Sequence, residues 1–492
     1  MFVGRKRELE ELEKYYREDT FHFAVFYGRR RVGKTCLINR FRENKKSIYF
    51  AAAETTAKEN LELLSVQILS VLAPEAPRNP FGSFTEAFDY CFKMAGKKRI
   101  VFVIDEYPYL AESDRAVSSI LQAAIDKYKA RSRLFVILCG SSMSFMENQV
   151  LGYKSPLYGR RTCQFKIKPF SYYECAEMLS GFNAEEKITL YGICGGIPEY
   201  VSRINNSLSV RQNAENLFFN PSGRLFEEPS NLLKQELRTP QTYNGIIAAI
   251  ASGASRLNEI ATKTGIETSQ CSNMLATLIG LEIVRKEVPL PLPSVKNGSG
   301  ARGEVQPGNP SRKTIYRLAD NMFRFWYRFV MPDLSRISMG FGKIACAEIF
   351  GRQRMPSASS GKIETYTGPV FEECAAQFLW REMGRKRYSF NNLGRWWGSN
   401  PKEKKEEEID ILAVDNPADS ACGASALFGE CKWRTLRTDS DTLDDLVRKS
   451  ELFPYFAKKQ YILFSKSDFS VELKRTASRR KDTALVGLAE MY

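Results

Sequence analysis

The sequence predicts an α/β protein of several domains, and three features carry that prediction. The chain has 492 residues, which is more than one hydrophobic core usually accommodates. Near its start, a glycine-rich turn lies between an apolar run and a helical pattern, as in parallel sheets covered by helices. After a mainly helical middle part, helix and strand patterns alternate again towards the end of the chain. We therefore expect a parallel-sheet domain, a helical module and a second α/β domain.

Composition excludes several classes of protein. No apolar run reaches the length of about 18 residues that a membrane span needs, and the first residues lack the apolar core of a secretory signal. Eleven scattered cysteines without a CxxC pair predict reduced thiols in a cytoplasmic protein. Any Ser-His-Asp triad would have to use His22, the only histidine, and a single histidine excludes a His-rich metal site. We expect His22 to be a packed residue.

The charge indicates an acidic partner. The net charge is +15, which favours DNA as a partner. The positive excess lies in the first 360 residues, whereas residues 361–492 are almost neutral. The near-neutral charge of residues 361–492 therefore counts against strong binding of DNA by that segment alone.

The stretch "FAVFYGRRRVGKTCLINRF" contains a phosphate-binding loop. It reads as strand, turn and helix, and residues 28–35 fit the pattern G-x-x-x-x-G-K-[ST]. Loop amides and the helix N-terminus would surround phosphate oxygens, Lys34 would reach the β and γ phosphates, and Thr35 would bind Mg²⁺. We expect ATP and Mg²⁺ as cofactors. The expected nucleotide-binding residues of the loop are Gly28, Arg29, Arg30, Arg31, Val32, Gly33, Lys34, Thr35 and Cys36.

Two carboxylates complete the expected ATP site. The apolar run in "KKRIVFVIDEYPYL" ends in Asp105 and Glu106, which is typical of a buried strand of a parallel sheet. Asp105 would hold Mg²⁺ through water, and Glu106 would polarise the attacking water as the catalytic base.

Two further segments leave alternatives open. In "RLFVILCGSS", Ser141 or Ser142 could sense the γ-phosphate from a neighbouring strand end, or cap a helix. In "SPLYGRRT", Arg160 and Arg161 could act as an arginine finger, or they could be ordinary surface residues.

These motifs together resemble the archaeal-type ATPase family, a branch of AAA+-like P-loop proteins related to STAND signalling NTPases. The matching segments are "FVGRKRELEEL", "YGRRRVGKT", "VFVIDEYPYL", "VILCGSS", "SPLYGRR" and "GGIPEY", in the order of the family. The resemblance implies a P-loop ATPase domain with a helical lid over residues 1–235. It also implies that residues 2–5 (Phe2, Val3, Gly4 and Arg5) lie near the adenine and that Pro198 in the lid touches the nucleotide.

The middle of the chain predicts a winged helix-turn-helix domain over residues 236–330. Three short helical patterns are followed by a strand, a Gly/Pro/Ser-rich piece at 291–313 and a second strand. The expected recognition helix has no Lys or Arg and offers only Gln270 and Asn273 for base contacts. We therefore favour a protein-protein or intramolecular role over sequence-specific DNA reading. Wing residues that could touch phosphates are Lys296, Arg302, Arg312 and Lys313.

Residues 331–360 are expected to be a linker, and residues 361–492 a third domain. In this domain "EEIDILAVD" and "ALFGECKW" read as strands of a hairpin centred near residue 420. That register places Asp410 opposite Glu430, and the two-residue repeat of a strand puts Lys432 on the same face as Glu430. Two buried carboxylates repel unless a cation lies between them. Mg²⁺ or Mn²⁺ would satisfy them, and Lys432 could orient or deprotonate a water for attack on a phosphodiester.

This arrangement resembles the PD-(D/E)xK nuclease superfamily over about the last 130 residues. The resemblance implies a restriction-endonuclease-like α/β fold, catalytic roles for Asp410, Glu430 and Lys432, and Glu372 on the preceding helix as a further metal ligand beside Asp410 and Glu430. The alternatives are a structural Glu-Lys ion pair and a degenerate, inactive fold.

The preferred interpretation is a cytoplasmic ATP-hydrolysing protein coupled to a metal-dependent, nuclease-like domain that processes DNA. The main alternative is a STAND-like signalling or regulatory ATPase whose C-terminal domain is an inactive binding module. A DNA-binding regulator with a vestigial sheet domain is a third class. A homo-oligomer is compatible with each of them.

Overall fold

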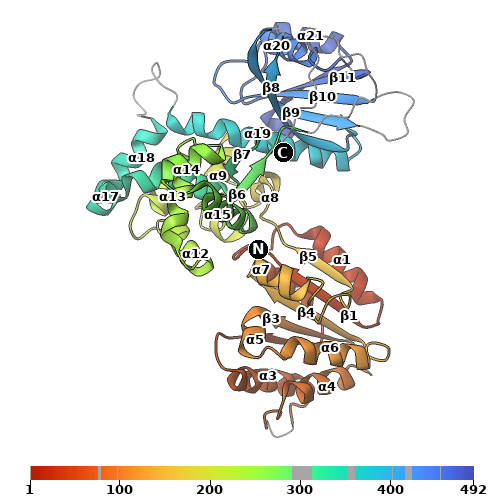
Figure 1. Cartoon of the computed structure of the whole chain (residues 1–492). Coiled ribbons are helices and arrows are strands. Elements are labelled where there is room, and N and C mark those ends of the chain that lie inside the picture. Colours follow the sequence, from red (N-terminus) through yellow and green to blue (C-terminus); the bar gives the residue numbers. More distant parts are fainter. Residues whose placement is uncertain are drawn as a thin grey trace. The chain divides into compact units, whose positions relative to one another are not determined.

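The computed structural model describes residues 2–75, 79–96, 98–290, 313–351, 361–401, 403–415, 424–454 and 456–492. The chain divides into two compact units (Figure 1). The first consists of Met1–Phe170 with Ile197–Glu199, and the second of Ser171–Gly196 with Tyr200–Tyr492. Most of the expected lid therefore groups with the second unit. None of the helices in the described part of the chain is long and apolar enough to span a membrane.

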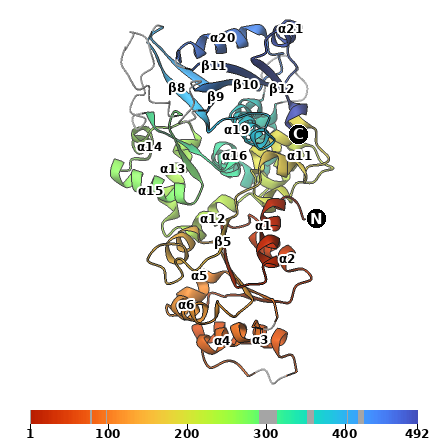
Figure 2. The same cartoon turned by 90° about the vertical axis from the view of Figure 1, so that its right-hand side faces the viewer.

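The first unit is a five-stranded sheet in the order β2-β3-β4-β1-β5, and every neighbouring pair is parallel. The three central strands are buried along their whole length, which explains why their sequences are continuous apolar runs. Helix α3 packs on β2 and on α4, and both helices lie side by side in Figures 1 and 2. The strands are β1 His22–Tyr27, β2 Ser47–Ala51, β3 Ile100–Asp105, β4 Leu134–Gly140 and β5 Cys163–Lys166. The helices are α1 Lys6–Arg17, α2 Lys34–Arg42, α3 Ala57–Leu72, α4 Phe84–Met94, α5 Tyr107–Ser113, α6 Val117–Tyr128, α7 Met143–Phe145 and η1 Met146–Val150.

The second unit begins with helices and a small hairpin. Three helices followed by an antiparallel strand pair, with Glu287 opposite Ile315, agree with the order of elements expected for a winged helix. The winged-helix assignment itself remains a prediction, because most of the expected wing, including Lys296, Arg302 and Arg312, lies outside the described residues. The elements are α8 Tyr172–Ala176, α9 Ala184–Cys194, α11 Val210–Phe218, α12 Glu228–Glu236, α13 Pro240–Ala251, α14 Leu257–Thr264, α15 Thr268–Gly280, β6 Val284–Glu287 and β7 Ile315–Leu318. Helix α10 Pro198–Val201 begins in the first unit and ends in the second.

The expected linker at 331–360 is helical as far as Phe350, and residues 352–360 lie outside the described part. Its last helix packs on α11 through buried side chains, among them Ala345 and Ile349, which are one helical turn apart. Gly342 permits a close approach, because a Cβ there would collide with the carbonyl oxygen of Phe219. Packing at helical spacing therefore makes this segment part of the core. Its elements are α16 Asn321–Phe325, η3 Trp326–Val330, η4 Met331–Asp333, α17 Leu334–Arg336, η5 Ile337–Phe341 and α18 Gly342–Phe350.

A mixed sheet in the order β12-β11-β10-β9-β8 forms the end of the second unit. Strands β8, β9 and β10 are antiparallel, whereas β10, β11 and β12 are parallel. Helix α19 covers one face, and α20 and α21 cover the other (Figures 1 and 2). The expected order of helix, three strands, helix and strand is present, and α21 and β12 extend it. The elements are α19 Lys362–Gly384, β8 Asn392–Asn400, β9 Lys405–Asp415, β10 Ser425–Lys432, α20 Ser440–Ser450, β11 Lys458–Ser465, α21 Val471–Arg479, β12 Thr483–Gly487 and η6 Leu488–Met491.

Candidate functional site

The phosphate loop connects β1 to α2 at the carboxyl edge of the first sheet. Gly28 has φ of 149°, and a Cβ there would collide with the carbonyl oxygen of Ile167. Gly33 has φ of 89°, a left-handed conformation that glycine adopts without strain. The buried Lys34 donates hydrogen bonds of 2.9 Å to the carbonyl oxygens of Gly28 and Arg29, and burial lowers its pKa. The loop therefore holds this ammonium group at the start of α2, beside the first free amides of the helix.

Asp105 ends β3 and lies within reach of the loop. Its Oδ2 accepts a hydrogen bond of 2.9 Å from the Thr35 hydroxyl and one of 2.6 Å from the Tyr49 hydroxyl. Burial, followed by the hydrogen bond to Asp105, raises the pKa of Tyr49. A carboxylate and a hydroxyl in contact are oxygen donors of the kind that Mg²⁺ prefers, so Thr35 and Asp105 fit the expected cation.

Glu106 is hydrogen-bonded to Ser141, the residue that follows the neighbouring strand β4. The Ser141 hydroxyl lies 2.9 Å from Oε2 and 3.1 Å from Oε1 of this carboxylate and donates to it. Glu106 itself adopts φ of 49°, which turns the chain sharply after β3. Ser142 occupies the N-cap position of α7 but makes no capping hydrogen bond through its side chain. Of the two serines, Ser141 is therefore the one placed at the expected ATP site.

Residues that the family resemblance assigned to the nucleotide also lie at the loop. The Arg5 guanidinium donates to the carbonyl oxygens of Val32 (3.0 Å) and Lys168 (2.5 Å) and stacks over the Phe170 ring at 4.7 Å. The Pro198 ring adjoins Gly33, since a Cβ built there would be 3.9 Å from the proline Cγ. The N-terminal segment and Pro198 of the "GGIPEY" motif thus flank the loop within the first unit.

Two residues considered for catalysis are held by their own neighbours. Arg160 forms a forked ion pair with Asp126 and also donates to two backbone carbonyls. His22 is buried between the rings of Tyr15 and Phe135, and burial lowers its pKa. These contacts favour the structural interpretation of both residues.

The second candidate site lies on β9 and β10. The antiparallel register pairs Gly429 with Ile411, as expected for a hairpin centred near residue 420. The Cys431 amide donates to Asp410 Oδ2 at 2.9 Å, so Asp410 lies beside the end of β10. Lys432 Nζ donates to Glu430 Oε1 at 2.7 Å, and Lys449 Nζ from α20 lies 3.5 Å from Oε2. Glu430 is therefore paired with two lysines.

Three carboxyl groups influence one another at this site. Burial and the charge of Asp410 raise the pKa of Glu372 to about 7. Burial and the charge of Glu430 raise the pKa of Asp410 to about 6. The four residues expected from the sequence are thus brought together. Their oxygen chemistry fits Mg²⁺ or Mn²⁺, yet no group of three or more His, Cys, Asp or Glu side chains in the described ranges is arranged to hold a metal ion.

Sequence reasoning missed the basic residues around these carboxyl groups. Arg395 on β8 lies 3.5 Å from Glu372 and also pairs with Glu408, and its Nε and Nη1 are buried without a hydrogen-bond partner. Lys449, which approaches Glu430, was missed as well, and so was Tyr49, which donates to Asp105 at the ATP site. Each comes from an element far away in the sequence, and no local pattern marks it.

Comparisons with known proteins support an ATPase domain in the first part of the chain. A model of an ATPase domain predominantly from Archaea matches residues 2–204, and a model of archaeal and bacterial proteins of unknown function matches residues 326–442. An uncharacterized protein of Methanocaldococcus jannaschii is 32% identical over 457 residues, which cover 92% of each chain. An uncharacterized ATP-binding protein of the same organism is 59% identical over 46 residues, which cover 9% of this chain and 78% of that protein.

Among solved structures, the Walker-type ATPase of Pyrococcus abyssi aligns with 66% of this chain and 96% of its own, at 18% identity and a TM-score of 0.47. The Aeropyrum pernix ORC1 protein in complex with DNA aligns with 68% and 95%, at 15% identity and a TM-score of 0.32. The expected archaeal-type ATPase domain is confirmed by the family match, whereas no comparison confirms a nuclease superfamily. The similarity along almost the whole chain shows that the protein belongs to a family of archaeal-type ATPase-domain proteins.

Proposed function

We propose that the protein binds and hydrolyses ATP at the phosphate loop and that ATP controls a metal-dependent, nuclease-like site in the second unit. The observation that carries the second half is the meeting of Glu372, Asp410 and Glu430, with raised pKa values at Glu372 and Asp410, beside Lys432. Buried carboxyl groups that raise one another's pKa are stabilised when a cation neutralises them.

At the ATP site, each residue has a role that its contacts support. Lys34 would exchange its carbonyl partners for the β and γ phosphates, and Glu106, oriented by Ser141, would accept a proton from the attacking water. Thr35 and Asp105 would hold Mg²⁺, which when bound would neutralise charge on the phosphates.

At the second site, Asp410, Glu430 and Glu372 would hold Mg²⁺ or Mn²⁺, which when bound would stabilise charge on a scissile phosphate. Lys432 would leave its ion pair with Glu430 and orient a water for attack on the phosphodiester. Arg395 is paired with Glu287, Glu372 and Glu408, and its guanidinium would exchange one of these carboxylates for a phosphate oxygen of the substrate.

The test is cleavage of supercoiled plasmid and of single-stranded DNA with Mg²⁺ or Mn²⁺, with and without ATP. Asp410→Asn should abolish cleavage and leave ATP hydrolysis unchanged, and Lys432→Ala should slow cleavage without weakening binding of Mn²⁺. Cleavage by the Asp410→Asn protein at the wild-type rate would refute the assignment.

A regulatory ATPase with an inactive C-terminal domain is the second candidate. The ion pairs of Glu430 with Lys432 and Lys449, and that of Glu372 with Arg395, favour it, because each satisfies a carboxylate without a metal. Under this alternative no DNA is cut under any condition, and Mg²⁺ and Mn²⁺ leave the stability of the second unit unchanged.

A further inference from the structure

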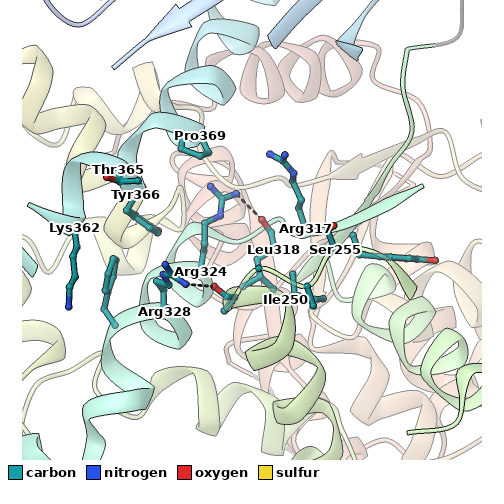
Figure 3. Close-up of a pocket in the computed structure, with 15 residues that line it drawn as sticks. Ile250, Ser255, Arg317, Leu318, Arg324, Arg328, Lys362, Thr365, Tyr366 and Pro369 are labelled. Carbon is teal, nitrogen blue, oxygen red and sulfur yellow. Dashed lines mark hydrogen bonds between the residues drawn. The ribbon is translucent and has the colours of Figure 1, made fainter. Parts of the chain in front are cut away.

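The second unit contains a pocket of about 760 Å³ that is separate from both sites described above (Figure 3). Its walls are the end of α13 with the turn after it, strand β7, the helical segment α16–η3 and the first turns of α19. In Figure 3, Lys362, Thr365 and Tyr366 of α19 lie on one side and Ser255 and Leu318 on the other, with Arg324 and Arg328 between them. This volume lies within the range of about 300–1,000 Å³ that is typical of small-molecule sites.

Every charged side chain among the described residues that line the pocket is a cation. Arg317, Arg324, Arg328 and Lys362 contribute to the wall, and no Asp or Glu is among the described residues that line it. Lys362 and Arg328 are exposed, so their charges are available to a ligand. Arg324 and Arg317 are paired with Glu373 and Glu287, so the exposed charges of Arg328 and Lys362 are the ones that an anion would meet first.

Two of these arginines are held by groups outside the pocket wall. Arg324 pairs with Glu373 at 2.6 Å through Nη2, while its Nη1 is buried without a hydrogen-bond partner. Burial and, next, the charge of Arg395 lower the pKa of Arg317. A buried N–H group without a hydrogen-bond partner costs stability.

Helix α19 adds to the attraction for anions. It runs for 23 residues from Lys362, and its first turns form part of the pocket wall. The free amides and the positive end of the helix dipole at this terminus favour a negatively charged group. The hydroxyl groups of Ser255 and Thr365 are further donors in the wall.

The wall also contains a rigid aromatic part. The Tyr366 hydroxyl donates to the carbonyl oxygens of Gly192 (2.6 Å) and Asn321 (3.1 Å), which fixes the position of the ring. The Phe329 ring lies against it, with centroids 5.3 Å apart, and Tyr316 also lines the pocket. Fixed aromatic rings beside cations suit a ligand that combines a flat ring with a phosphate.

We propose that this pocket binds a nucleotide, with its phosphate at Arg328, Lys362 and the start of α19 and its base against the aromatic wall. The pocket is a second nucleotide site, independent of the phosphate loop and of the proposed nuclease. Two sources share this chemistry: a free mononucleotide, and the phosphorylated end of a single DNA strand.

The test is calorimetric titration of the full-length Lys34→Ala protein, in which the phosphate loop no longer holds nucleotide. The probes are ADP, inorganic phosphate, and a short single-stranded oligodeoxynucleotide with and without a 5′-phosphate. Tighter binding of ADP identifies a free nucleotide as the ligand, and tighter binding of only the phosphorylated oligonucleotide identifies a strand end.

Two variants in the Lys34→Ala background make the test specific. Lys362→Glu should weaken binding of the tighter probe by at least about tenfold, while the acidic residue in the first turn preserves the helix. Arg328→Ala should weaken it by a similar factor. The matched control removes two exposed cations of α21 outside the pocket, Arg475→Ala with Arg479→Ala, and should leave affinity unchanged. The proposal is overturned if no probe binds, or if both pocket variants bind as tightly as the control.

Discussion

The two acidic sites of the molecule differ in what satisfies their carboxylates. In the first unit, hydroxyl groups do so, since Thr35 and Tyr49 donate to Asp105 and Ser141 donates to Glu106. In the second unit, carboxyl groups face one another, and the pKa values of Glu372 and Asp410 rise to about 7 and about 6.

The difference indicates which ligand each site responds to. Hydroxyl donors keep the first site assembled without a ligand, so its function depends on a phosphate arriving at a prepared loop. In the second site, burial and a neighbouring carboxylate disfavour the charged forms of Glu372 and Asp410, so binding of a cation or uptake of a proton would stabilise it. Nucleotide should therefore act mainly on the first site, and divalent cations and pH mainly on the second.

The largest expected effect is a loss of ATP binding at the first site without a change in the response of the second site to Mn²⁺. Lys34→Ala removes the buried ammonium group of the phosphate loop, and charge-assisted hydrogen bonds to phosphate contribute about 1.5–3 kcal/mol each. Binding of ATP should fall by at least about 100-fold in calorimetry. The thermal shift that Mn²⁺ produces without nucleotide should stay as in the wild type. A loss of both responses would show that the two sites are one system.

The next effect separates binding from catalysis within the first site. Glu106→Gln keeps the hydrogen bond from Ser141 but cannot accept a proton, so hydrolysis should fall by about 100-fold or more. Affinity for ATP should change little. Steady-state hydrolysis and ATP titration measure the two quantities, and hydrolysis at the wild-type rate would remove Glu106 from the role of base.

The third effect compares two carboxylates of the second site. Because the pKa of Asp410 is raised in the folded protein, the folded state binds more protons than the unfolded state between about pH 4 and 6. Its contribution to stability is thus present at low pH and is lost as the pH rises through this window. At pH 8 without metal, Asp410→Asn should raise the free energy of unfolding, by on the order of 1 kcal/mol.

The matched variant is Glu430→Gln, which leaves Lys432 and Lys449 without their carboxylate and should lower stability under the same conditions. Thermal melting at pH 5 and pH 8 with EDTA measures both changes. Equal effects of the two substitutions would contradict the contrast between a repelled and a paired carboxylate.

The smallest effect concerns Arg160. Its ion pair with Asp126 is partly exposed, so Arg160→Ala should reduce the free energy of unfolding by about 0–1 kcal/mol. Hydrolysis of ATP should stay within about twofold of the wild type, because side-chain contacts place Arg160 in a structural role. A large loss of hydrolysis with unchanged stability would restore the arginine-finger interpretation.

Local pattern allowed much of this structure to be predicted. Apolar runs marked β1, β3 and β4 because both faces of these strands are buried, and the loop centre gave the register of β9 and β10. Helix α21 and the short strand β12 were missed, since neither has a strong apolar pattern. Tyr49 and Arg395 were missed because the sheet order brings them to a site, and Lys449 because the packing of α20 on the sheet does so; the local sequence predicts neither.

The most direct test of the proposed cation site is calorimetric titration of Mn²⁺ into the full-length Lys34→Ala protein at pH 8 without nucleotide. Mn²⁺ should bind in the second unit, and this binding should be lost when Asp410→Asn or Glu372→Gln is added. Identical binding curves for all three proteins, or no binding by any of them, would contradict a cation site among Glu372, Asp410 and Glu430.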